Sequence, residues 1–277
     1  MLREAAHQDL DEQAVVALEK AAALEKAANK KKLFESQASF FARSASLLEQ
    51  AAEKFASINQ HQQAAKCFLQ AGRLLQRNNK ALFAAKLLEA SSSELAKCND
   101  PNSAPLLMEA ALLRHKQGHT AQAASTIKAL AKAEQDAKHY DQALTYYEFV
   151  ADMYKNTFVR FQDQTQDEED CLQHIAHLLT IKQTPEFRKA AGMFADLGCR
   201  MLIMRLQQTT ARMMIFKAIV CVLAAADVAA AKKMHFDFCH ADFSFEASPE
   251  AKFLLQLISA CNSKDKNCFD QARQRTT

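Results

Sequence analysis

Residues 63–72 read Gln-Ala-Ala-Lys-Cys-Phe-Leu-Gln-Ala-Gly, and this stretch contains the pattern that decides the fold. The small residues Ala64 and Ala65 are followed by Phe68, which falls four positions after Ala64 on the same helical face. A short side chain lets a neighbouring helix approach closely, and a bulky one fills the groove beside it. The stretch therefore predicts a helix that packs tightly against another helix.

This pattern recurs along the chain with a period of roughly twenty residues. The later small residues are Ala84-Ala85, Ala104, Ala123-Ala124 and Ala143, and the larger apolar residues that follow them are Leu88, Met108, Ile127 and Tyr147. One helix of about fifteen residues and a short turn fill each period, so two periods make a hairpin of about forty residues. Such hairpins are typical of helical solenoids related to the tetratricopeptide repeat (TPR). We therefore expect an all-α, TPR-like right-handed superhelical array of antiparallel helical hairpins that form a twisted sheet.

Glycine and proline are scarce in the sequence. The chain of 277 residues has 4 of each, where ordinary composition would give about 19 and about 14. A β-sandwich or barrel needs frequent turn residues, and a phosphate-binding loop needs clustered glycines. The sequence therefore excludes Rossmann, P-loop and all-β folds.

Turn signals divide the chain into helices. Asn99-Asp100-Pro101 ends one helix and begins the next, and Gly118 is expected at the left-handed position that follows a helix. Thr184-Pro185 and Ser248-Pro249 each predict an N-cap followed by a proline at the first helical position. Leu197-Gly198 predicts the end of a further helix.

Two domains are expected from the change in composition along the chain. Residues 1–200 carry the repeat and predict the TPR-like helical hairpin sheet. From residue 201 the helices become richer in Met, Ile, Val and Ala, so residues 201–277 are expected to form a C-terminal globular helical bundle that caps the last apolar face. Residues 156–167 lack clean helical periodicity and predict a turn followed by a helix start.

The net charge and the cysteines limit which binding partners and which cellular compartment are expected. The net charge of +3 is too small for a nucleic-acid binder, which needs a concentrated basic face. The 8 cysteines form no CxxC pair and follow no signal peptide, so we expect a reducing, cytoplasmic environment. The most apolar stretch, 218–231, is interrupted by Asp227 and predicts a buried helix rather than a membrane span.

Two clusters of histidine and cysteine could be considered for metal binding: Cys171-x2-His174-x2-His177 and His235-x3-Cys239-His240. Zinc sites usually need four convergent ligands from two chain segments, and neither cluster has a partner pair with ligand spacing. We expect these side chains to pack or to lie at helix edges. With no GxSxG or HExxH motif in the sequence, we expect no metal, no cofactor and no enzymatic activity.

A basic and aromatic segment near the N-terminus consists of Lys30, Lys31, Lys32, Phe34, Phe40 and Phe41. Lysines favour an anionic lipid surface and exposed aromatic rings add apolar area to the contact, so the segment predicts contact with a membrane. The alternative is that Phe40 or Phe41 packs into the first helical hairpin, because aromatic residues at helical spacing are more often found in the core.

Several stretches, in the same order, resemble the soluble NSF attachment protein (SNAP) family. They are Ala51-Ala-Glu-Lys-Phe55, Gln63 to Gly72, Asn99-Asp100-Pro101, Gly118 to Ala124, Asp141 to Lys155, Phe216-Lys217-Ala218, Asp227 to Lys232, and Asp242-Phe243-Ser244 with Glu250-x-Lys252. No single motif is specific, and the collinear order over nearly the whole chain carries the resemblance.

The resemblance implies a function without chemistry of its own. Family members bind the acidic SNARE four-helix bundle through basic side chains and recruit the hexameric ATPase NSF, which unwinds the bundle during vesicle-mediated transport and membrane fusion. A phenylalanine-bearing loop touches the membrane, and Ser36 to Phe41 resembles that loop, so a cytoplasmic, peripheral membrane location is implied. The chain ends at Thr277, about where the family's leucine-bearing, NSF-stimulating tail would begin.

Basic positions of the family are only partly retained. Those that match are Lys97, Arg212, Lys217 and Lys252, which the resemblance implies as SNARE-binding residues. Those that differ are His119, Ser125, Asp170 and His174, which stand where the family has Arg or Lys. The loss of positive charge implies a divergent member of the family with a weaker grip on an acidic coiled coil.

Two hypotheses of function follow. The first is a SNAP-like adaptor for SNARE disassembly. The second is a TPR-like protein-interaction scaffold or co-chaperone that binds a non-SNARE partner. The placement of Lys97, Arg212 and Lys217 separates them: a common concave surface favours the first hypothesis, and scatter to the convex side favours the second.

Overall fold

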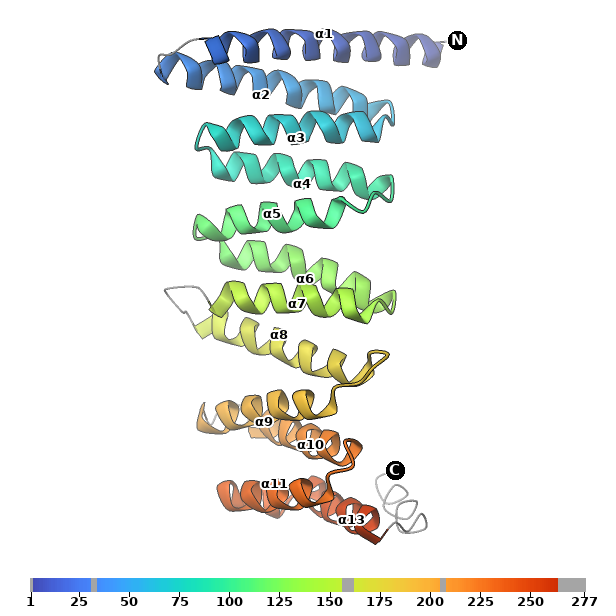
Figure 1. Cartoon of the computed structure of the whole chain (residues 1–277), viewed down its shortest axis with the longest axis vertical. Coiled ribbons are helices and arrows are strands. Elements are labelled where there is room, and N and C mark those ends of the chain that lie inside the picture. Colours follow the sequence, from blue (N-terminus) through green and yellow to red (C-terminus); the bar gives the residue numbers. More distant parts are fainter. Residues whose placement is uncertain (1, 31–33, 156–161, 205–207, 264–277) are drawn as a thin grey trace. The chain divides into compact units, whose positions relative to one another are not determined.

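The computed structural model describes residues 2–30, 34–155, 162–204 and 208–263, and every regular element in these ranges is a helix (Figure 1). The chain divides into two compact units, residues 1–130 and residues 131–277. The first contains α1 (Leu2–Lys30), α2 (Phe34–Ser57), α3 (His61–Arg77), α4 (Ala81–Lys97), α5 (Ser103–Lys116) and most of α6 (Thr120–Asp136). The second contains the end of α6, α7 (Tyr140–Lys155), α8 (Gln162–Ile181), α9 (Phe187–Met204), α10 (Gln208–Ala224), α11 (Val228–Ala241), α12 (Phe243–Glu246) and α13 (Pro249–Ser263).

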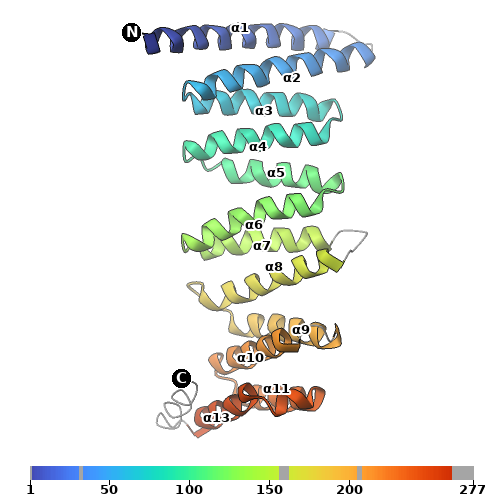
Figure 2. The same ribbon diagram turned by 180° about the vertical axis from the view of Figure 1, so that it is seen from behind.

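In the first unit each helix from α1 to α5 lies beside its neighbour in the sequence and runs in the opposite direction, as Figure 2 shows. Ala64, Ala65, Ala84 and Ala85 are fully buried or nearly so, at 0–1% exposure. Close helix packing at the predicted small residues is therefore confirmed, and the fold is an all-α, TPR-like array of helical hairpins. In α5 the pattern is weaker, because Ala104 lies in the first turn, next to the connection from α4, and is only half-buried.

The turns between these helices share one backbone conformation. Asn59, Asn79 and Asn99 have φ values of 61°, 55° and 54°, and successive ones are twenty residues apart in the numbering. In the α3–α4 turn the N–H of Lys80 donates to the carbonyl of Leu75 at 2.9 Å, which closes the end of α3. Asparagine tolerates the left-handed region better than most residues, so a 17-residue helix and a three-residue turn account for the repeat.

Two of the predicted helix boundaries are confirmed, one helix end and one helix start. Gly118 follows α5 with φ of 85°, as a left-handed cap requires. Ser248 precedes α13, and its Oγ accepts a hydrogen bond from the N–H of Ala251 at 3.1 Å, with Pro249 at the first helical position.

The predicted helix start at Thr184-Pro185 is wrong by two residues. The N–H of Glu186 donates to the carbonyl of Leu179 at 2.9 Å, which ties the connection back to α8. Helix α9 begins only afterwards, at Phe187, and its first backbone bond is from Ala190 to the carbonyl of Glu186.

The predicted helix end at Leu197-Gly198 is also wrong, because both residues lie inside α9. A Cβ atom on Gly198 would be 2.9 Å from Cγ1 of Ile215 and 3.3 Å from the carbonyl oxygen of Ala211, both in α10. The glycine therefore allows α10 to pack closely against α9 and does not end the helix.

The second unit is continuous across residue 200, where the sequence predicts a domain boundary. That position lies inside α9, which packs along α10, and α11 to α13 complete the unit. The apolar stretch 218–231 divides between α10 and α11, and its residues Ala218, Ile219 and Cys221 are buried. None of the described helices has the length and apolar character that a membrane crossing requires.

Candidate functional site

Lys97, the predicted SNARE-binding residue of the first unit, lies in the last turn of α4 and is half exposed. Its Nζ is 2.7 Å from Oε1 of Glu94, and the other oxygen of that buried carboxylate is 2.7 Å from Nδ1 of His61. Burial alone would raise the pKa of the Glu94 carboxyl, but the hydrogen bonds and charges of Lys97 and His61 lower it below its usual value. Lys97 therefore stabilises a bridge, made through Glu94 and His61, between the end of α4 and the start of α3.

Arg212 in α10 is likewise engaged within the protein. Its Nε is 3.3 Å from Oδ2 of Asp242, and its guanidinium also donates to the hydroxyl of Ser244. Asp242 caps α12, where its Oδ1 accepts from the N–H of Ser244 at 2.9 Å. Burial raises the pKa of Asp242, but the Ser244 and Arg212 hydrogen bonds outweigh that effect and lower it. Arg212 thus fastens α10 to the start of α12.

Lys217 and Lys252 lie on two helices that pack together. The rings of Phe216 and Phe253, one residue before Lys217 and one after Lys252, stack with centroids 6.0 Å apart. Nζ of Lys217 is 5.6 Å from the centroid of the buried Phe194 ring, in a cation–π contact. Lys252 is exposed on α13.

The structure therefore groups three of the four predicted basic residues in the second unit, on α10 and α13. Lys97 belongs to the first unit and is described there by itself. Of the positions that differ from the family, His119 and Ser125 are exposed on the surface.

The predicted membrane segment is helical rather than a loop from Phe34 onward, because it forms the start of α2. Phe41 is 8% exposed and belongs to the hydrophobic core of the first unit, and Phe40 packs against the same core. For these two rings the structure shows the alternative, packing into the first hairpin. Lys31 and Lys32 lie outside the described residues, and membrane contact through Lys30 and Phe34 stays a prediction.

The first histidine and cysteine cluster packs as expected. Cys171 is fully buried, and the His174 ring stacks on the ring of Tyr147 with centroids 4.7 Å apart. Burial raises the pKa of Tyr147 to about 12. Burial of the His177 ring is the main cause that lowers its pKa, and the positive charge of Lys217 lowers it further. The described ranges hold no group of three or more His, Cys, Asp or Glu residues that could bind a metal ion.

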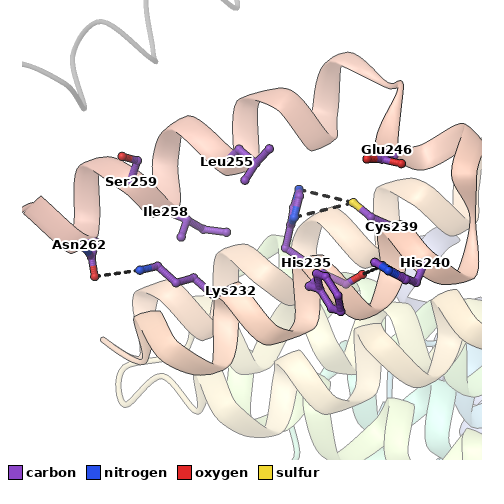
Figure 3. Close-up of a pocket in the computed structure, with 10 residues that line it drawn as sticks. Lys232, His235, Cys239, His240, Glu246, Leu255, Ile258, Ser259 and Asn262 are labelled. Atoms are coloured by element: carbon purple, nitrogen blue, oxygen red, sulfur yellow. Dashed lines mark hydrogen bonds between the residues drawn. The ribbon is translucent and has the colours of Figure 1, made fainter.

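The second cluster borders a cavity of about 490 Å³ between α11 and α13 (Figure 3). A ring N–H of His235 donates to the carbonyl of Ala251 at 3.0 Å, and Sγ of Cys239 is 3.8 Å from both ring nitrogens. The cavity walls are largely apolar, with Phe236 and Leu255 both exposed. The histidine therefore joins α11 to α13.

Sequence reasoning missed a second hollow, of about 460 Å³, that lies over α3, α4 and α5. Leu69, Leu95 and Leu106 line it, and at one end Arg73 binds the carboxylate of Glu109, with Nη2 to Oε2 at 2.8 Å. The available signal was Lys66 and Arg73, which are seven residues apart and thus lie on one face of α3.

Comparison with known proteins places this arrangement in a family. A family model described as soluble NSF attachment protein, SNAP, matches residues 12–274. A soluble NSF attachment protein homolog of fowlpox virus (strain NVSL) is 25% identical over 230 residues, which are 82% of this chain and 80% of the relative. The alpha-soluble NSF attachment protein of Vitis vinifera is 25% identical over 166 residues, 60% of this chain and 55% of the relative.

Among solved structures, a STAND-class signal transduction ATPase with a tetratricopeptide repeat sensor from Pyrococcus horikoshii aligns with a TM-score of 0.44 and 12% identity. The alignment covers 96% of this chain and 43% of that one. The family model spans residues of both compact units and the helices that carry Lys97, Arg212, Lys217 and Lys252. The chain belongs to the soluble NSF attachment protein (SNAP) family, as a divergent member.

Proposed function

We propose that this chain is an adaptor that binds assembled SNARE four-helix bundles and recruits the NSF ATPase, which disassembles them in vesicle-mediated transport and membrane fusion. The observation that carries the proposal is the family match over residues 12–274, which takes in both helical units. In this role the chain performs no reaction of its own, because it supplies binding surfaces and NSF supplies the ATP hydrolysis.

The second unit offers a basic contact for an acidic coiled coil. Lys217 and Lys252 lie on adjacent helices, and the stacked Phe216 and Phe253 rings fix the spacing of those helices. Charge complementarity of this kind speeds association and sets the register of two partners more than it adds affinity. Arg212 supports this contact from within, because its guanidinium is engaged by Asp242 and Ser244.

A cytoplasmic chain held at the membrane periphery fits this role, since SNARE bundles are attached to membranes. A weak lipid contact in addition to the SNARE contact would raise the effective concentration of the adaptor at its target. Lys30 and Phe34, at the junction of α1 and α2, are the predicted residues of that contact.

The proposal is tested by pull-down of the full chain with assembled SNARE bundles, followed by addition of NSF with a non-hydrolysable ATP analogue. We expect a complex that retains all three components, and SNARE disassembly once ATP and magnesium replace the analogue. Failure to retain any assembled SNARE set from the source cells would contradict the proposal. Retention of a helical peptide from another protein in that case would favour the scaffold alternative.

A further inference from the structure

Two large apolar side chains project from the first turn of α4. Leu82 is 38% exposed and Phe83 is 64% exposed. The next two residues, Ala84 and Ala85, are fully buried against the neighbouring helices. Phe83 therefore points mainly to solvent and Leu82 lies at the edge of the packed face, and neither belongs to the apolar clusters that the described residues form.

Basic residues surround this pair. Arg77 ends α3, Lys80 occupies the position before α4, and Lys86 follows one turn after the pair, and all three are exposed. No aspartate or glutamate occurs between residues 54 and 88. The next acidic residue, Glu89, is engaged by Arg114, with Nε to Oε1 at 2.5 Å. We call Arg77, Lys80, Leu82, Phe83 and Lys86 the α3–α4 corner.

The α3–α4 corner lies at the same edge of the first unit as the start of α2. Nδ2 of Asn78 donates to the backbone carbonyl of Ala38 at 3.0 Å, which joins the turn to the first turns of α2. Figures 1 and 2 both show the α3–α4 turn on the side where α1 passes into α2. A flat surface that meets one of these two segments can therefore meet the other.

We propose that the α3–α4 corner is a membrane-binding site for anionic lipid, with Leu82 and Phe83 inserted at the interface and the three basic residues against the headgroups. A helix end with exposed apolar side chains and basic residues around them matches the chemistry of a bilayer surface. None of the corner residues lines the hollow over α3–α5, so the two features are separate.

Insertion at this corner would define how the first unit faces the bilayer. One weak anchor leaves a protein free to rotate on the surface, whereas two anchors at one edge restrict its orientation and raise the total affinity. The site deepens the peripheral contact proposed above, but its test needs neither SNARE proteins nor NSF. Failure here is therefore distinguishable from failure of the adaptor role.

The test is flotation of the full chain with liposomes of phosphatidylcholine alone or enriched in phosphatidylserine. We expect flotation with the anionic liposomes, at least about fivefold less bound protein for Leu82→Ser with Phe83→Ser, and a similar loss for Lys80→Glu with Lys86→Glu. The matched control is Val15→Ser with Val16→Ser, because these residues of α1 are 44% and 46% exposed and lie outside the corner. We expect the control to float like the unmodified chain.

Each other outcome overturns the proposal. A folded Leu82/Phe83 variant that floats like the unmodified chain excludes insertion, and so does an unmodified chain that ignores anionic liposomes. Equal flotation with neutral lipid would remove the basic residues from the contact. A loss of SNARE binding in the absence of lipid, with flotation unchanged, would assign the corner to a protein partner. Circular dichroism melting curves check that every variant is folded.

Discussion

Two glycines in α9 have opposite surroundings, and they show how one residue fixes the approach of two helices. Gly198 is buried, and a Cβ atom there would come within 3.4 Å of the backbone of Ala211 and Ile215. Gly192 is exposed, with nothing within 4 Å of a Cβ atom. The first position needs glycine for space, whereas the second has no such need.

We expect Gly198→Ala to be less stable than Gly192→Ala by about 1–3 kcal/mol, because the added methyl group must push α10 away from α9. Gly192→Ala should itself stabilise the protein by up to about 1 kcal/mol, since alanine favours the helix. Urea unfolding followed by circular dichroism measures both. Equal stability of the two variants would show that α10 adjusts freely.

Glu94 is a buried carboxylate whose charge the folded protein favours. Its pKa is lower in the folded protein than in the unfolded chain, so its stabilising contribution is present at neutral pH. That contribution is lost as the pH falls below the unfolded value of about 4.3 and through the folded one.

We therefore expect Glu94→Gln to lower the free energy of unfolding by about 1–2 kcal/mol at pH 7, and by less as the pH falls below about 4. The matched control is Glu53→Gln, because Glu53 is exposed on α2. Urea titrations at both pH values give the comparison. A difference between Glu94→Gln and the unmodified chain that does not change with pH would exclude a role for the charge.

At the scale of the element, the turns show which residues the backbone prefers. Asparagine or glycine occupies the left-handed position after α2, α3, α4 and α5, but Lys138 and Ala226 have φ values of 64° and 60°. A residue with a Cβ pays a conformational cost there that glycine does not. The turns after α6 and α10 are thus less favourable than those that carry asparagine or glycine.

We expect Ala226→Gly to raise the free energy of unfolding by about 0.5 kcal/mol, since relief of the left-handed strain exceeds the added freedom of the unfolded chain. Ala229→Gly, at an exposed helical position of α11, should have the opposite sign, with a loss of up to about 1 kcal/mol. Thermal melting of the two variants side by side gives the signs. A loss of stability in both would contradict the argument.

The elements that could be predicted are those that a local pattern determines. The alanine pairs predicted the helices of the first unit, and Ser248 predicted a helix start, because each signal acts within one turn of its own position. Gly198 could not be placed, since a glycine that ends a helix and one that allows close packing look alike in sequence. The burial of Phe41 depends on α1 and α3 beside it and not on its own neighbours.

At the scale of the whole molecule, the basic residues predicted to bind SNAREs are of two kinds: some are paired within the protein, and others are exposed to solvent. The side-chain partner of Arg212 could not be predicted, because Asp242 is thirty residues away in the sequence. Lys252 is exposed, so its charge can face a partner. The resemblance identified both positions but could not tell these roles apart.

We expect Lys252→Glu to slow association with a SNARE bundle several-fold without a change in melting temperature, and the effect should shrink at high salt. Arg212→Ala should lower the melting temperature as well, because it frees α12 from α10. Stopped-flow binding and thermal melting separate the two variants. An unchanged association rate for Lys252→Glu would remove α13 from the contact surface.

The asparagine turns at 59, 79 and 99 determine by how many residues the chain can be lengthened here without disturbing the packing of its helices. Because α3 and α4 are equal in length and are bounded by the same turn, a tandem duplication of residues 61–100 would add one hairpin in phase with its neighbours. An insertion inside a helix that does not keep its helical phase would instead turn the apolar side chains beyond it to the wrong side of that helix. Relatives of different length are therefore expected to differ here by whole hairpins.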